Sequence, residues 1–361
     1  MKIKTFISLI FVSGLILPVM GQKDSIATAK SETINRTDTF ALFAGTGMLD
    51  ATIKFDLGTY LKKKLKNESI DGVIVFHFSN SDSIDKNIKI KTRGIFRQQY
   101  CSFPPMQLNF KKPVAAYQNS GSIKKLKLVT HCEQGKGSDD YVLREYLVYK
   151  LFNVLTDTSY RVRLLRINYV DSEKDKKTIS QYGFFIEPTD ILAARINTIP
   201  LKKVTLTQKH VIPDVMTRLA IFNYMIGNYD WAVPNQHNVL ILKSLDISKS
   251  PMAIAIPYDF DFTGFVNPYY ALPTDETGLK NIRERLFTGM CRTREDFRKE
   301  ILKIAGMKKE LAVIKSEIQA KAKELGVTTG AGSCDGPGMG GNCGQKKPLN
   351  CSGAKQAKLA Q

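Results

Sequence analysis

Two short stretches of this sequence decide which fold and which chemistry we expect. The first is residues 226–231, IGNYDW, followed by residues 236–242, QHNVLIL; the second is residues 257–262, PYDFDF. They place an acid in a loop, an amide at the start of a strand and another acid after a second strand. Phosphoryl transfer uses this layout, because one carboxylate orients the attacking hydroxyl while an amide oxygen and a second carboxylate hold magnesium. The alternative interpretation is a buried β-hairpin whose Asp and Asn residues cap turns.

The segments on either side predict strands, then a helix, then more strands at 161–170 and 182–187, and then a mostly helical half. Alternating apolar residues at 51–57, 72–78 and 88–92 are typical of half-buried antiparallel strands. Helical spacing follows at 141–155, at 213–226 and from 295 to about 325, with Gly306 as a possible interruption. Strands and helices that are segregated in this way favour an α+β fold with two lobes, in which the acid motifs lie on a strand pair.

Three patches resemble an atypical protein-kinase group that includes the CotH-type spore-coat kinases and the HipA-type kinases. They are residues 93–112, which hold an Arg-Gly pair and a Lys-rich strand, the Gly-Asn-x-Asp loop at 227–230 with Asn238, and Tyr258-Asp259 after a proline. The chain as a whole is similar to an exported, signal-bearing bacterial family related to CotH, over most of residues 40–325. The resemblance implies a two-lobed protein-kinase-like fold, with an antiparallel sheet-rich N-lobe and a mainly helical C-lobe.

The same resemblance implies roles for the acids and amides. Asp230 would position the substrate hydroxyl, and Asn238 and Asp259 would hold magnesium, while Asp261 could bind a second metal or be a surface turn residue. In the family pattern the amide lies five positions after the acid, which here is Asn235. We prefer Asn238, because it directly precedes a strand, and keep Asn235 as the second choice.

A kinase-like site also needs a cation on the nucleotide phosphates, usually fixed by a glutamate on a helix. Lys125 and Lys127 share one face of a strand, because side chains alternate along it. We expect Lys127 to pair with Glu145 on the next helix; the alternative is an exposed lysine and an exposed helical glutamate. His237 is expected to make a structural hydrogen bond. Other cations that could bind phosphate are Arg93, Arg97 and Lys112.

The ends of the chain indicate export. Lysines at positions 2 and 4 precede an apolar run at residues 6–18, which is too short to span a bilayer and ends in small residues, as a secretory signal peptide does. The residues from 328 onward are rich in Gly, Cys and Lys and cannot bury much surface. The predicted organisation is a signal peptide (1–21), a flexible lead-in (22–38), a β-rich N-terminal lobe (39–187), a mainly helical C-terminal lobe (188–327) and a disordered tail (328–361).

The net charge and the cysteines indicate which binding partners and which metal sites to expect. The net charge of +19 favours nucleotide phosphates or an anionic surface. Because aromatic residues do not alternate with the lysines, we do not expect nucleic acid as a partner. The chain has six cysteines and four histidines but no Cys-x-x-Cys pair, which argues against structural zinc. Cys101 and Cys132 each lie beside a strand-like run, and we predict a disulfide between them.

The predicted function is therefore that of an exported phosphotransferase, in the periplasm or at the cell surface, which uses ATP with Mg²⁺ or Mn²⁺. It would move the γ-phosphate to a hydroxyl of a protein, a sugar or a lipid, and no transmembrane segment is expected in the mature chain. The main alternative is a non-catalytic protein of the same fold that binds an anionic envelope or surface partner. A third is a structural envelope protein crosslinked through its tail cysteines.

Overall fold

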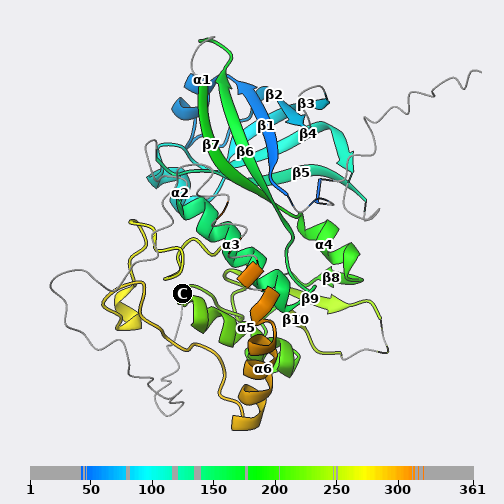
Figure 1. Cartoon of the computed structure of the whole chain (residues 1–361), viewed down its shortest axis with the longest axis vertical. Helices are drawn as coiled ribbons and strands as arrows, with labels where there is room; N and C mark the ends of the chain where they lie inside the picture. Colours follow the sequence, from blue (N-terminus) through cyan, green and yellow to red (C-terminus); the bar gives the residue numbers. More distant parts are fainter. Residues whose placement is uncertain are drawn as a thin grey trace, which may run out of the picture. The chain divides into compact units, whose positions relative to one another are not determined.

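The structure is a computed structural model, shown in Figure 1, and it describes residues 42–43, 45, 47–78, 82–115, 121–133, 140–174, 178–202, 204–246, 248, 251–310, 312–313, 316 and 320. All of them belong to one compact unit, Thr37–Gln361. The predicted signal peptide, lead-in and C-terminal tail lie outside the described residues. Those three expectations therefore stay predictions.

A closed barrel of seven strands, in the order β1-β2-β3-β4-β5-β7-β6, forms the first part of the described chain. Neighbouring strands pair antiparallel except β1 and β6, which run parallel and close the ring. The strands run from blue to green in Figure 1. Their bounds are β1 (Leu49–Phe55), β2 (Ile70–His77), β3 (Ser83–Thr92), β4 (Met106–Ala115), β5 (Ser122–Val129), β6 (Val162–Asp171) and β7 (Thr178–Ile186).

The barrel core is built by the period-two pattern that the sequence shows. Along β1, Leu49, Ala51, Ile53 and Phe55 are buried, because every second side chain points to the same face of a strand. They belong to one apolar cluster that all seven strands supply. Fully burying a side chain as large as Phe55 stabilises the fold by about 1.5–3 kcal/mol.

Helices cover the barrel and build the rest of the described chain. The longest, α3, packs against β6 and β7 and buries Val148, Tyr149 and Phe152. The helix α5 ends at Gly227, whose left-handed backbone (φ 67°) suits a residue without Cβ. The helices are α1 (Leu57–Lys62), α2 (Ile95–Tyr100), α3 (Asp140–Leu155), α4 (Thr189–Arg195), α5 (Pro213–Ile226) and α6 (Arg294–Gly306), with single 3₁₀ turns at Gln208–His210 and Asp275–Thr277.

The predicted fold class is wrong. The strands form a closed barrel with a parallel β1–β6 pair, and not the antiparallel N-lobe of a two-lobed kinase fold. Nor do helices dominate after the barrel: α4, α5 and α6 alternate there with three strands and with an irregular stretch from 258 to 293. Alternation in a sequence shows that a strand is half-buried, but it does not show which distant strand it pairs with, and pairing with a distant strand is what closes a barrel.

A small second sheet carries both acid motifs. Its strands are β8 (Thr198–Pro200), β9 (Val239–Ser244) and β10 (Ile254–Pro257), in the order β10-β9-β8. β9 and β10 are antiparallel, with Val239 opposite Pro257. The residue that precedes β9 therefore lies beside the residue that follows β10. The prediction that a strand pair carries the acid motifs is confirmed.

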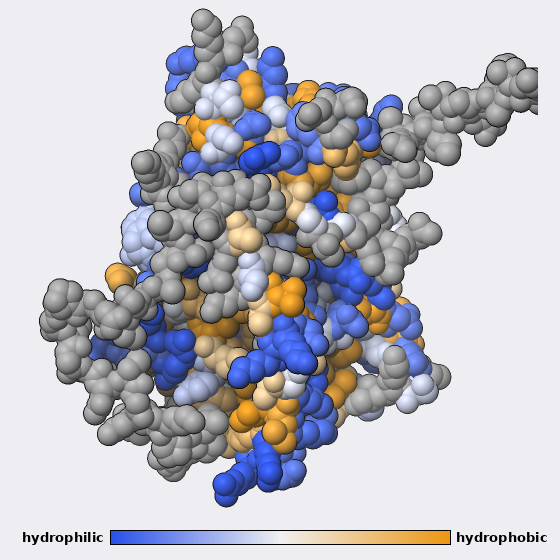
Figure 2. Space-filling model, viewed as in Figure 1, coloured by the Kyte–Doolittle hydropathy of each residue, from blue (hydrophilic) through white to orange (hydrophobic). Residues whose placement is uncertain are grey.

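Several local predictions also hold. The expected helix at 213–226 is α5, and the one at 141–155 is α3 with one more residue at its start. The predicted interruption at Gly306 is where α6 ends. Figure 2 shows orange hydrophobic residues exposed among blue hydrophilic ones over α6, where Ile301 and Leu302 are among the exposed apolar side chains. Within the described ranges no helix is both long enough and apolar enough to cross a membrane.

Candidate functional site

The acid loop begins where α5 ends. Asn228 is buried, and its amide nitrogen donates to Asn223 Oδ1 at 2.9 Å. Its own side-chain oxygen accepts a hydrogen bond from the backbone N–H of Asp230 at 3.0 Å. The IGNYDW motif therefore forms a turn that is fixed by buried amides, which hold the Asp230 backbone in one place.

The Asp230 carboxylate has two partners in the loop that leads into β9. Its Oδ1 lies 2.7 Å from His237 Nε2, and its Oδ2 accepts from Asn238 Nδ2 at 3.0 Å. The same amide nitrogen donates to the Asp230 carbonyl at 2.9 Å. Asn238 uses its nitrogen in these bonds, so its oxygen is the atom that could bind a metal. Asn235 is exposed, and its oxygen accepts from the His237 N–H at 3.2 Å, which favours Asn238 over Asn235 as the site amide.

The second acid motif is joined directly to the first. The Tyr258 N–H donates to the Asn238 carbonyl at 3.0 Å, which extends the β9–β10 pairing by one residue. Asp259 follows with a positive φ of 64°, and its N–H donates to Tyr149 Oη on α3 at 2.9 Å. A left-handed Asp is uncommon, and it persists only where the surrounding structure holds its backbone in place. Here the α3 tyrosine fixes it, and the Asp259 carboxylate is exposed.

Asp261, in contrast, is buried at 7% exposure, so its alternative interpretation as a surface turn residue is wrong. Tyr270 Oη donates to Asp261 Oδ2 at 3.3 Å. Burial, the negative charge of Asp259 and, more weakly, that of Asp230 raise the pKa of Asp261 to about 7, while Arg97 opposes the rise. Three of the predicted site acids therefore interact through their charges, and a cation near them would offset their repulsion.

Among the predicted cations, Lys127 lies beside Tyr258 of the second acid motif. Its Nζ lies 5.8 Å from the centre of the Tyr258 ring. Partial burial and the positive charge of Arg93 lower the pKa of Lys127, whereas Asp259 raises it, so Lys127, Arg93 and Asp259 interact electrostatically. Lys125 lies on the same strand and is exposed, but no contact of the described residues links it to the acids.

Glu145 does not pair with Lys127 as expected. It is buried on α3, and its Oε2 lies 3.8 Å from Arg97 Nη1 of α2. Burial raises the pKa of Glu145 well above its ordinary value, and the charge of Asp261 adds to the rise, while Arg97 opposes it. The helix glutamate therefore faces the Asp261 side of the site, with an arginine as its counter-ion.

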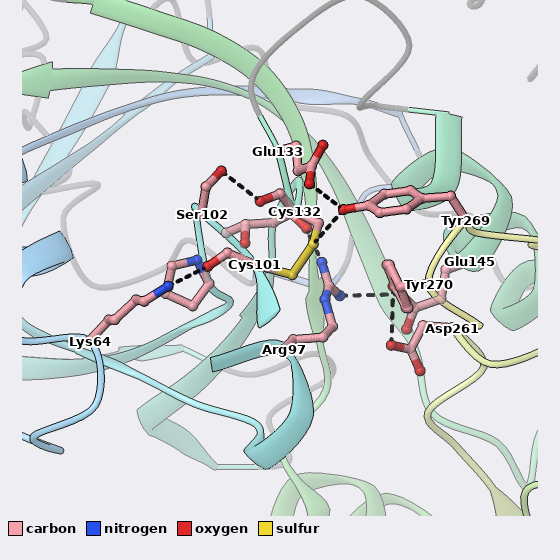
Figure 3. Close-up of a disulfide and its surroundings, with 12 residues drawn as sticks. Lys64, Arg97, Cys101, Ser102, Cys132, Glu133, Glu145, Asp261, Tyr269 and Tyr270 are labelled. Atoms are coloured by element: carbon pink, nitrogen blue, oxygen red, sulfur yellow. Dashed lines mark hydrogen bonds and ion pairs between the residues drawn. A yellow bond between two sulfur atoms is a disulfide. The ribbon is translucent and has the colours of Figure 1, made fainter. Parts of the chain in front are cut away.

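Arg97 is the central residue that the sequence interpretation placed only among alternatives. Its Nη2 donates to the Thr130 carbonyl at 2.5 Å, just after β5, and Figure 3 shows its guanidinium between the disulfide and the Glu145, Asp261 and Tyr270 side chains. An arginine whose side chain is only 12% exposed needs negative charge nearby to be tolerated. Glu145 forms the ion pair, and the charge of Asp261 also favours the guanidinium. The available signal was the cysteine four positions later, since a disulfide there fixes α2.

The disulfide joins Cys101 to Cys132, as predicted, across 31 residues of sequence. It links the end of α2 to the segment after β5, so the strand that carries Lys127 and the helix that carries Arg97 are connected covalently (Figure 3). Backbone bonds support the same junction, because the Phe103 N–H donates to the Cys132 carbonyl at 3.0 Å. The disulfide therefore holds Lys127 and Arg97 at the same edge of the barrel.

The described residues hold no ready-made cage for a metal ion. Among the residues that the structure describes, no group of three or more His, Cys, Asp or Glu is arranged to hold a metal ion. Mg²⁺ bound to a nucleotide needs only one or two carboxylates, because phosphate and water complete its octahedron. Asp259, Asp261 and the Asn238 oxygen are the groups that could supply such ligands, and Lys127 interacts through its charge with Arg93 and with Asp259.

Comparison of the chain with protein-family models and with curated protein sequences found no match.

Proposed function

We propose that this protein is a phosphotransferase that uses ATP with Mg²⁺ or Mn²⁺ and transfers the γ-phosphate to a hydroxyl group. The observation that carries the proposal is the junction of the two acid motifs: Tyr258 bonds to Asn238, which bonds in turn to Asp230. That chain of contacts places the loop acid and the acid after β10 on one small sheet. The proposal rests on this site and not on a kinase fold, and the motif-level likeness to CotH and HipA kinases supports it only as a prediction.

Each residue then has a task that its surroundings suit. Asp259, exposed and held by Tyr149, would bind the magnesium, with Asn238 and Asp261 beside it. Lys127 and Arg93 would take the phosphate charge. Asp230, whose carboxylate already accepts from Asn238, would accept the proton of the attacking hydroxyl.

Export remains part of the proposal. The predicted signal peptide and the Cys101–Cys132 disulfide are both compatible with an oxidising compartment. ATP would have to be supplied there. The competing function is a non-catalytic protein that binds an anionic surface partner, which the net charge of +19 favours.

Calorimetry with ATP and either metal tests the proposal. Asp259→Asn should abolish metal-dependent nucleotide binding, because it removes a charge next to magnesium in the ground state. Asp275→Asn removes an equally negative, exposed charge that lies outside both acid motifs, and should bind as the wild type does. Lys127→Ala should weaken binding.

Asp230→Asn should bind nucleotide almost normally and lose ATP turnover, because the amide cannot accept a proton. A wild-type protein that binds no nucleotide with either metal would remove the enzyme proposal and favour the binding protein. Equal binding by the Asp259 and Asp275 variants would show that the metal is held elsewhere.

A further inference from the structure

The three most exposed large hydrophobic side chains of the described residues are Ile95, Leu272 and Leu65, at 85%, 73% and 62% exposure. They come from three separate segments. Gln98 Nε2 of α2 donates to the Lys64 carbonyl at 2.5 Å, which holds the turn that carries Leu65 against the helix that carries Ile95. The segments that carry two of the three exposed residues are therefore in direct contact.

Aromatic rings bring the third segment to the same place. The Tyr270 ring lies 5.6 Å, centre to centre, from both Phe96 and Tyr100 of α2, and Leu272 follows it by two residues. Phe96, Tyr100 and Tyr269 are themselves 41%, 48% and 46% exposed. We call this group the α2 patch: Leu65, Ile95, Phe96, Tyr100, Tyr269 and Leu272.

The patch is not explained by the packing of the fold. α2 buries none of its six residues, although three of them are apolar or aromatic. Its conformation is nevertheless fixed, because Cys101 follows the helix and is joined to Cys132. Several exposed apolar side chains on segments that contact one fixed helix mark a site of interaction.

The charges around the α2 patch are mainly positive. Residues 62–66 read KKKLK and surround Leu65, with Lys62 and Lys66 exposed. Lys91 Nζ donates to the Asn67 side chain at 3.2 Å and adds another cation to this turn. Of the nearby acids, Glu68 pairs with Lys63 at 2.7 Å and Glu133 accepts from Tyr269 Oη at 2.5 Å, while Asp275 and Glu276, three and four residues after Leu272, are exposed.

We infer that the α2 patch docks this protein onto an anionic lipid surface. Protruding aliphatic side chains partition into the boundary between head groups and acyl chains, and tyrosines prefer the same interface. Lysines beside them are attracted to anionic head groups and are screened by salt. This inference does not depend on the proposed phosphotransfer, because none of the patch residues holds the nucleotide in that proposal.

Sedimentation with lipid vesicles tests the inference. The chain starting at Gln22 is used, because the apolar run at 6–18 would partition by itself and the compact unit begins at Thr37. It should bind vesicles of mixed phosphatidylglycerol and phosphatidylcholine, and bind pure phosphatidylcholine vesicles much less. The double variant Ile95→Asp/Leu272→Asp should weaken binding by on the order of a hundredfold, since each inserted aliphatic side chain contributes about tenfold.

Leu245→Asp is the matched control, because Leu245 is 53% exposed just after β9, outside the α2 patch. It should bind vesicles as the wild type does, and unchanged circular dichroism would show that all variants fold. Lys62→Gln/Lys66→Gln should reduce binding and its dependence on salt. The inference is overturned if the wild type does not bind anionic vesicles, or if it self-associates through the α2 patch instead. It is also overturned if the aspartate variants bind like the control, because binding would then come from diffuse positive charge.

Discussion

Removing the Cys101–Cys132 disulfide should destabilise the protein by a predictable amount. The bridge spans 31 residues. In the chain-entropy relation, closing a loop of that size lowers the entropy of the unfolded chain enough to stabilise the fold by about 4 kcal/mol. For a unit of this size, a loss of about 4 kcal/mol should lower Tm by roughly 8 °C.

The measurement is thermal and urea denaturation without reductant, comparing the wild type with Cys101→Ser, Cys132→Ser and the double variant. Each single variant already breaks the bridge, so the double variant should lose little more than either single one. Wild-type protein treated with reductant should lose a similar amount. A double variant within about 1 kcal/mol of wild type would refute the reasoning, because the chain-entropy relation allows no such small effect for a loop of this length.

Two other predictions concern buried charge. Because the raised pKa of Asp261 keeps it protonated in the folded state, its contribution opposes folding increasingly as pH rises from about 3.8 to about 7. Asp261→Asn should therefore be more stable relative to wild type at pH 8 than at pH 5, and an equal difference at both values would contradict the assignment. Arg195→Ala should cost about 3–5 kcal/mol, because Arg195 and Glu187 are 7% and 0% exposed and lie 2.8 Å apart. Lys299→Ala breaks a pair with Asp214 that lies 3.0 Å apart and is about half exposed, and urea denaturation should detect little change. Similar losses in the two variants would show that burial does not decide the effect.

Burial also explains which site residues could be located from the sequence alone. The sequence could bring Asn238 and Asp259 near each other, because each lies within two residues of a strand and the two strands are close neighbours in sequence. Asp261 was left open between a metal ligand and a turn residue, because a residue four positions after the end of β10 can point either way. The structure buries it beside Arg97 and Tyr270.

The partner of Glu145 was not predictable in the same way. Lys127 and Arg97 are both cations on segments near the end of β5, and spacing alone does not choose between them. The choice is made by α2, which is held at that end by the disulfide and by the bond from Arg97 to the Thr130 carbonyl. Such a contact joins residues that are far apart in sequence.

The sequence by itself determined the local elements. Period-two alternation marked β1, β2 and β3, helical spacing marked α3 and α5, and Gly306 marked the end of α6, because each of these depends on neighbours within a few residues. Only the tertiary structure decided that β1 pairs in parallel with β6 and closes a barrel, which overturned the predicted two-lobed fold. The physical reason is that pairing between distant strands depends on loop closure and on the burial of both faces together, and no local pattern encodes either.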